Sequence, residues 1–146
     1  TIGTAAAKVD PKHLVYLGVR DREEPEHLLI ERFHIKKYLV EEVRTLGVEK
    51  CVAEVFERLT DCDIIYVSFD VDSMDSEFIS DGTGTPVPKG FYKPEIITML
   101  ELFMSNPKVK CLEVVEINPL LDSHGNSMAE ATFEILEQVT PFIEGV

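Results

Sequence analysis

Two kinds of apolar pattern alternate along this chain, and this alternation is the feature that most limits the folds it can adopt. The continuous apolar run over 14–19 is typical of a strand buried on both faces, and the runs over 38–40, 64–69 and 109–117 indicate three further strands. Between these runs, apolar residues recur at spacings near 3.6, which indicates amphipathic helices. Repeated strand–helix–strand order predicts an α/β fold with a mainly parallel sheet and helices on both of its faces.

The expected helices are placed by their first turns and apolar faces. Five helical segments are predicted, over 25–33, 43–47, 48–59, 94–103 and 127–139. In the first, Leu28, Leu29 and Phe33 form the expected inner face. Ser127 and Glu130 form a Ser-x-x-Glu pair, which predicts a capping box at the start of the last helix. Residues 73–93 show no period, and an irregular stretch of this length inside a domain is usually functional or disordered.

The composition bounds the class of protein. With 146 residues, 45% of them hydrophobic, the chain is long enough for a single domain, which we expect to span residues 1–146. A formal net charge of −13 argues against nucleic acid as a partner, because phosphate binding needs clustered Lys and Arg. No apolar run approaches the ~18–20 residues that span a membrane. The number of cysteines is odd, so we expect buried free thiols and a reducing compartment. Residues 1–7 lack a signal-peptide pattern, and we expect a cytoplasmic protein.

Charged residues follow three of the predicted strands. These are the stretches Arg20–Glu23, Asp70–Asp72 and Glu116–Pro119. Ligands of parallel α/β sheets gather beyond the carboxyl ends of the strands, so we expect a functional site there. Residues two apart in a strand point the same way, which would bring the carboxylates of Asp70 and Asp72 together. A divalent cation would relieve their repulsion, which makes a metal site the first hypothesis.

An Asp-x-Asp sequence has other interpretations. Phosphohydrolases of the haloacid-dehalogenase type place a nucleophilic Asp and an acid/base Asp in this way, but they need Thr or Val where this chain has Met74. Glycosyltransferases that use nucleotide sugars hold a metal diphosphate with Asp-x-Asp, but nothing nearby in the sequence is typical of a nucleotide site. A third interpretation accounts for more residues.

Several motifs of the chain occur together in one known family. These motifs are Tyr16-Leu17-Gly18-Val19-Arg20-Asp21, Ser68-Phe69-Asp70-Val71-Asp72-Ser73-Met74-Asp75, Gly82-Thr83-Gly84-Thr85-Pro86 and Glu116-Ile117-Asn118-Pro119. In order and spacing they closely resemble the arginase/agmatinase (ureohydrolase) superfamily, and its arginase branch most of all. The resemblance runs from about residue 14 to the C-terminus. It implies a three-layer α/β/α fold, of which this chain is roughly the C-terminal half.

The resemblance also implies a chemistry and a set of residues. The family hydrolyses guanidino groups with two manganese ions, and Asp70 and Asp72 match two of its metal ligands. Glu116 matches the Glu that pairs with the substrate guanidinium, a planar group that a carboxylate can accept bidentately. Thr85 matches a residue that lines the same pocket. The implied partner is a small guanidino compound.

Glu23 and Glu26 match acidic positions that arginases use near the substrate α-amino group, with Glu in place of a shorter Asp at the first. The alternative is a purely structural role, because two acids at the start of a helix are stabilised by the helix dipole without any substrate. Ser76 stands where the family usually has Pro, and the loop over 75–84 is one residue longer than is typical.

The remaining ligands of the family come from upstream Gly-Gly-Asp-His and Asp-Ala-His-x-Asp segments that this sequence does not contain. Asp122-Ser123-His124 follows the last strand, where we expect a polar loop. The parent protein is therefore predicted to be a manganese-dependent arginase, with agmatinase or formimidoylglutamase as alternatives, and this portion alone is predicted to be inactive. A non-catalytic module for assembly or regulation is the alternative from another class. A half-sheet with an open edge also predicts association, including a homo-oligomer.

Overall fold

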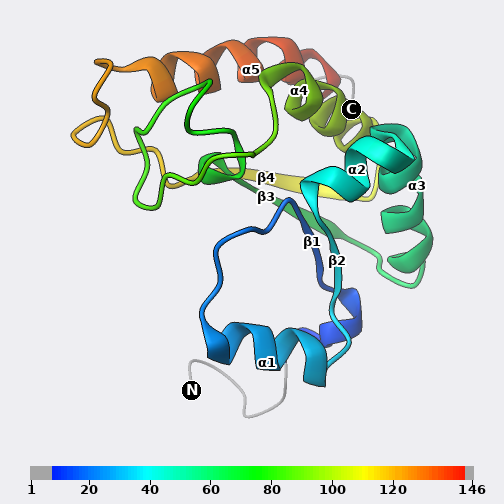
Figure 1. Ribbon diagram of the computed structural model, residues 1–146. Helices are drawn as coiled ribbons and strands as arrows, with labels where there is room; N and C mark the ends of the chain where they lie inside the picture. Colours follow the sequence, from blue (N-terminus) through cyan, green and yellow to red (C-terminus); the bar gives the residue numbers. More distant parts are fainter. Residues whose placement is uncertain (1–7, 144–146) are drawn as a thin grey trace.

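The computed structural model describes residues 8–143 of the chain (Figure 1). The expectation about a signal peptide at residues 1–7 lies outside the described residues. In chain order the elements are η1 (Pro11–His13), β1 (Val15–Leu17), α1 (Glu24–Arg32), β2 (Lys36–Tyr38), α2 (Val40–Leu46), α3 (Val48–Arg58), β3 (Ile65–Asp70), η2 (Val71–Ser73), α4 (Lys93–Met104), β4 (Val109–Val115) and α5 (Ser127–Ile143). Strands and helices alternate, as the sequence pattern predicts.

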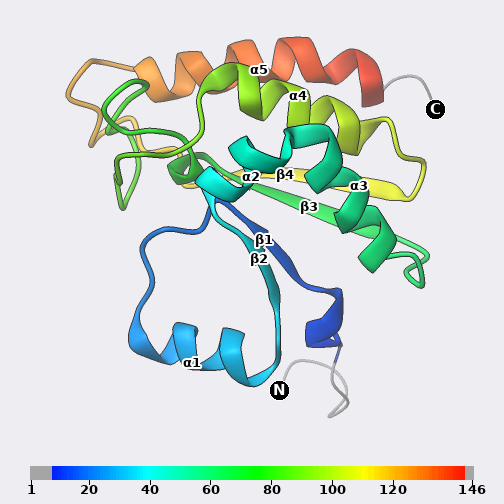
Figure 2. The same ribbon diagram turned by 45° about the vertical axis from the view of Figure 1, so that its right-hand side comes forward.

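The strands form two parallel pairs and not one continuous sheet. β1 pairs with β2 in a register that opposes Val15 to Lys36. β3 pairs with β4 in a register that opposes Asp70 to Val115. Figures 1 and 2 show the β1–β2 pair beside β3, with α1 at the far side of β1–β2 from the other helices. All pairing between these strands is parallel, which confirms the predicted class of sheet.

Helices α3, α4 and α5 cover one face of the β3–β4 pair (Figure 2). Their inner side chains pack with the strands and form the main core, in which Val52, Phe69, Leu100, Phe103, Ile135 and Val139 are buried. Val43 of α2 is buried in the same core. An ion pair between Lys93 and Glu134 joins α4 to α5. The opposite face of β3–β4 carries Tyr66, which is 56% exposed, and Ser68. β3, which was expected to be a buried strand, is therefore exposed on one face. The burial on both faces expected for the run over 14–19 is also wrong, since Tyr16 of β1 is 38% exposed.

The predicted inner face of the first helix is also wrong. Leu28, Leu29 and Phe33 are 58%, 50% and 45% exposed, and Ile30 is the buried residue of α1. The apolar spacing correctly indicated a helix. Within the part of the chain that the structure describes, however, no other element packs on that side of α1, so these side chains face solvent.

Helix capping moves one predicted boundary and changes one predicted cap. The strand expected over 38–40 is observed at Lys36–Tyr38, and Val40 already begins α2, whose Glu42 carboxylate accepts the N–H of Leu39 at 2.7 Å. At α5, Ser127 is the first helical residue, and its hydroxyl donates to Asp122 at 3.0 Å. The cap of α5 thus comes from a preceding loop and not from the predicted pair of Ser127 with Glu130.

The three cysteines differ in their exposure to solvent. All three thiols are free, but they are not all buried: Cys51 is buried, Cys62 is half-buried and Cys111 is exposed on β4. Among residues 8–143, no helix is both long and apolar enough to cross a membrane.

Candidate active site

The two aspartates of the Asp-x-Asp sequence lie at the carboxyl end of β3. Asp70 is the last residue of the strand, whereas Asp72 lies in the 3-10 turn η2. Extended geometry is therefore not what brings them together, contrary to the prediction. The turn does so, because the side chain of Asp70 accepts the N–H of Asp72 at 3.0 Å while Val71 between them is fully buried. Because Val71 points into the core, it fixes the direction in which Asp70 and Asp72 face.

The environment of Asp72 is unfavourable for a second negative charge. Burial, repulsion from Asp70 and a hydrogen bond with that residue raise the pKa of Asp72 to about 6, with Arg20 opposing the shift and Glu116 adding to it. Carboxylates held together in this way suit a divalent cation, which would neutralise them and which prefers oxygen ligands. The donor set thus fits a manganese site in part, since two carboxylates supply fewer ligands than such a site needs.

Glu116 follows β4 and holds a backbone conformation that is rare for a residue with a side chain. Its φ is 68°, in the left-handed region. A Cβ atom built on Gly84 would lie 3.2 Å from the Glu116 carboxylate, so that loop passes close beside this side chain. The N–H of Asn118 donates to the carbonyl of Gly82 at 2.8 Å and ties the two segments together. The Gly82–Pro86 loop and the end of β4 therefore form one wall, as the motif order predicted.

The other predicted residues share one cavity of about 790 Å³ with the aspartates. Asp70, Asp72, Thr85, Glu23 and Glu26 all line it. Glu26 also has a structural task, since its carboxylate accepts the N–H of Glu23 at 2.9 Å and caps α1. Five of the six predicted residues thus meet in one cavity. The sixth, Glu116, does not line the cavity but acts electrostatically on Asp72.

Arg20 is a structural residue of the site whose role the sequence did not reveal. Its guanidinium donates to the carbonyls of Asp72 at 2.6 Å and Ser73 at 2.9 Å, and also to those of Gly18, Met74 and Val87. Burial lowers the pKa of Arg20, an effect that the nearby charges of Asp72 and Asp75 oppose. The bonded carbonyls of the turn and of Val87 lie 52 to 67 residues away in sequence, so the only local signal was an arginine after a strand.

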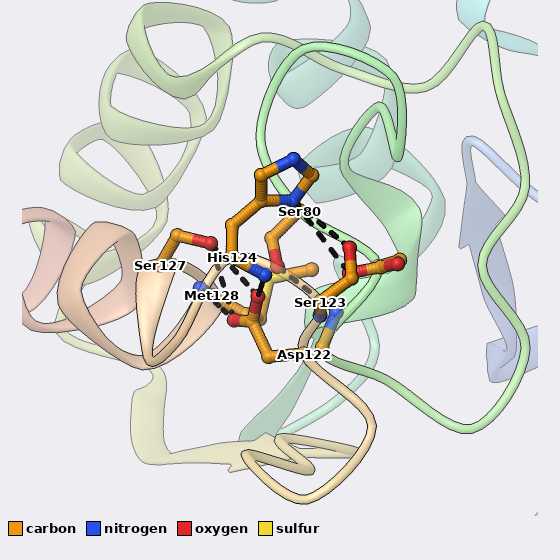
Figure 3. A network of polar contacts seen from close by, with 8 residues as sticks. Ser80, Asp122, Ser123, His124, Ser127 and Met128 are labelled. Carbon is orange, nitrogen blue, oxygen red and sulfur yellow. Dashed lines mark hydrogen bonds and ion pairs between the residues drawn. The ribbon is translucent and has the colours of Figure 1, made fainter.

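A second group of potential ligands lies where the loop before α5 (Figure 3) meets the loop between η2 and α4. Asp81, Asp122 and His124 each place one ligand-type atom within 4.8 Å of the others. These groups already have structural partners. Asp122 accepts the N–H groups of Met128 at 2.9 Å and His124 at 3.0 Å, which helps to lower its pKa to about 2, while Asp81 accepts the N–H of Ser123 at 2.8 Å. The network caps α5 and fixes the polar loop that the sequence predicted here.

Comparisons with known proteins agree on one family. A model of the arginase family matches residues 3–140. The arginase of Bacillus subtilis is 31% identical over 92% of this chain and 45% of its own length. The crystal structure of Helicobacter pylori arginase superposes with a TM-score of 0.86 at 31% identity, covering 94% of this chain and 46% of that one. Formimidoylglutamase of Bacillus subtilis shares the fold, with a TM-score of 0.83 at 22% identity over 93% and 43% of the two chains.

These matches confirm the fold predicted from the motifs, a partial arginase-like α/β domain. The chain spans less than half the length of the curated relatives it matches. The family model covers nearly all of the 146 residues. The chain belongs to the arginase family.

Proposed function

We propose that the chain supplies part of the active site of a manganese-dependent hydrolase that converts arginine to ornithine and urea. The observation that carries this proposal is the convergence of three carboxylates from two strand ends. Asp70 and Asp72 contact each other through η2, and Glu116 acts electrostatically on Asp72 from the end of β4. The assignment to a family that hydrolyses guanidino groups supports it.

The residues of the site would have two kinds of role, metal binding and substrate binding. Asp70 and Asp72 would bind manganese, which when bound supplies a nucleophilic water at neutral pH. Glu116 would accept two N–H groups of the guanidinium and hold the substrate's electrophilic carbon in place. Its left-handed backbone costs about 1–2 kcal/mol, which a merely structural residue would not need to bear. Thr85 would contact the same group from the Gly82–Pro86 loop.

Glu23 and Glu26 would set the preference for the rest of the substrate. They line the same cavity from the start of α1, where a positively charged α-amino group would be attracted to both carboxylates. A substrate that lacks this amino group, such as agmatine, would gain less from them. The likeness to formimidoylglutamase concerns the fold and does not support its substrate. The formimino substrate is the second candidate only because Glu23 replaces a shorter Asp, which would change the preferred substrate. We propose a cytoplasmic protein, which the three free thiols support.

A chimera tests the proposal. Bacillus subtilis arginase in which this chain replaces the segment that it matches should release urea from arginine when manganese is supplied. Agmatine and formimidoylglutamate are assayed in parallel, and activity on one of these alone would move the substrate assignment to it. A folded, manganese-loaded chimera that acts on none of the three would overturn the proposed enzyme.

Within the chimera, Glu116→Gln should retain manganese and lose at least 100-fold in kcat/KM, because a neutral amide cannot pair with the guanidinium. Glu113→Gln is the matched control, since Glu113 lies three residues earlier and its carboxylate instead accepts the hydroxyl of Ser68 at 2.7 Å. Equal activity of the two variants would remove Glu116 from the guanidinium role.

A further inference from the structure

A second, smaller cavity lies where the end of α1, the start of β2 and the end of α3 meet. Its volume is about 240 Å³, and its polar lining consists of Glu31, His34, Lys36, Lys37 and Arg58. Over residues 8–143, it shares no lining residue with the larger cavity of the candidate active site. The small cavity is therefore a separate place for a ligand.

The charge of this cavity is opposite in sign to that of the chain. The sequence has 27 acidic residues and 14 lysines and arginines, whereas the described lining of the cavity has three lysines and arginines, one histidine and one acid. A local excess of positive charge attracts small anions and repels cations such as a guanidino substrate. We call this space the basic cavity.

Two of the cations are held at the cavity and keep donors for a ligand. The Nη2 of Arg58 donates to the carbonyl of His34 at 3.3 Å, which ties the last residue of α3 to the turn after α1. Among the described residues this is the one hydrogen bond of a guanidinium that carries five N–H groups. Lys37 pairs with Glu31 at 3.3 Å, but that acid is exposed to solvent, and such a pair contributes little. An anion can therefore bind both cations without breaking a strong contact.

The other two basic groups are also positioned by the fold. The ammonium of Lys36 lies 4.0 Å from the ring centroid of Tyr38, a contact that leaves its charge without neutralisation. His34 follows the C-cap of α1 with a φ of 52°, in the left-handed region. The N–H of Ile35 donates to the carbonyl of Ile30 at 3.0 Å, which closes a helix end where glycine is usual. An exposed imidazole thus occupies a position whose backbone favours glycine.

The helix dipole accounts for only part of this arrangement. Cations in the last turn of a helix are favourable without a ligand, which explains Arg32 at the end of α1 and Arg58 at the end of α3. It does not explain Lys36 and Lys37, which belong to β2, or the histidine at the left-handed position. A ligand that is itself negative accounts for all the basic groups together.

We propose that the basic cavity binds a small oxyanion of the phosphate class, either as the free ion or as the terminal group of a small molecule. The volume is below the ~300–1,000 Å³ of typical ligand pockets, which limits the occupant to a group of this size. The forked guanidinium of Arg58 suits two phosphate oxygens at once, and the lysines add point charges. This inference goes beyond the proposed function, since it concerns a different cavity and requires neither metal nor guanidino substrate.

The test titrates the 146-residue chain with inorganic phosphate and with glycerol phosphate, a phosphate monoester. Sodium chloride at equal ionic strength is the reference. Calorimetry and amide NMR shifts are read together, and we expect one-to-one binding with shifts confined to residues 30–37 and the end of α3. Tighter binding of the monoester assigns the cavity to an organic phosphate, and equal or weaker binding of it assigns the cavity to the free ion.

Arg58→Gln should weaken phosphate binding about 10-fold or more, because it removes the forked cation. Arg32→Gln is the matched control: it removes the same charge from the end of α1, but its guanidinium lies over the ring of Phe33 and it does not line the cavity. His34→Gly should weaken binding about 3-fold while the chain stays folded, because glycine suits the left-handed backbone.

Three outcomes would overturn the proposal. Equal weakening by Arg58→Gln and Arg32→Gln would show that overall charge attracts the phosphate and the cavity does not. A less stable Arg58→Gln with unchanged phosphate binding would leave this residue a dipole role only. Absence of binding, or amide shifts at other elements, would remove the site. No arm measures hydrolysis, so an inactive enzyme would leave the result standing.

Discussion

At the scale of single residues, the backbone of Glu116 is the clearest sign that position outweighs stability at the site. Its φ of 68° is costly for a residue with a Cβ atom, by about 1–2 kcal/mol, and glycine does not bear this cost. We therefore predict that Glu116→Gly is more stable than Glu116→Ala by about 1 kcal/mol, measured by urea unfolding. The same two substitutions at Glu113, within β4, should show the opposite order, because glycine weakens a strand. An alanine variant as stable as the glycine variant at 116 would contradict the strained conformation.

Asp72 supports a second prediction, on pH. Its pKa in the folded chain is about 6, above its ordinary value of 3.8, so the folded state binds the proton more tightly. Stability from this group is therefore highest below pH 4 and falls as the pH rises through 6. Asp72→Asn removes this loss and should stabilise the metal-free chain at pH 7 by about 1 kcal/mol, after allowance for solvent screening. Urea unfolding from pH 4 to 7.5 should show the difference growing with pH.

Asp63→Asn, an exposed substitution before β3, is the control for Asp72 and should change the free energy of unfolding at pH 7 by less than about 0.5 kcal/mol. A constant difference for Asp72→Asn would show that its carboxylate is not held against Asp70 and Glu116. Most of these residues could be identified from sequence, because strand-end acids in a fixed order are a local pattern. The turn that holds Asp72 could not, since it depends on the burial of Val71 in the assembled core.

At the scale of elements, Arg20 joins the end of β1 to η2 through a planar guanidinium that donates to five carbonyls. Lysine keeps the charge but cannot reproduce this forked arrangement of donors. We predict that Arg20→Lys lowers the free energy of unfolding by about 2–3 kcal/mol, because partly buried carbonyls lose their partners. Arg32→Lys, on exposed α1, should change it by less than about 0.5 kcal/mol. Equal effects in thermal unfolding would remove the anchoring role of Arg20.

The elements also show why pattern analysis succeeds for some helices and fails for others. The helix expected over 94–103 is observed as α4, and its Ile96, Leu100 and Phe103 are buried against neighbours within the chain. The inner face of α1 was not correctly predicted, because spacing shows that a helix has an apolar side but not whether anything covers it. The capping of α5 by Asp122 was missed because the cap comes from a loop five residues before the helix and replaces the local Ser-x-x-Glu pair.

At the scale of the whole molecule, burial is uneven. The core of α3, α4, α5, β3 and β4 contains fully buried side chains such as Ile135 and Val139, whereas α1 buries Ile30 alone. Elements with few buried contacts open without global unfolding, so the molecule should have two levels of stability. We predict that native-state amide exchange of α1 proceeds through a local opening well below the global free energy of unfolding. The amides of α4 and α5 should exchange only through global unfolding.

Substitutions separate these two levels. Leu29→Ala, on the exposed side of α1, should change the global free energy of unfolding by less than about 0.5 kcal/mol, since its side chain is already half in solvent. Ile135→Ala should lower it by about 2–5 kcal/mol, because it opens a cavity in the main core. Denaturant-dependent exchange of both variants measures each level in the same molecule. If α1 exchanged at the rate of α5, and if Leu29→Ala destabilised the chain as much as Ile135→Ala, α1 would belong to the same cooperative unit as the core.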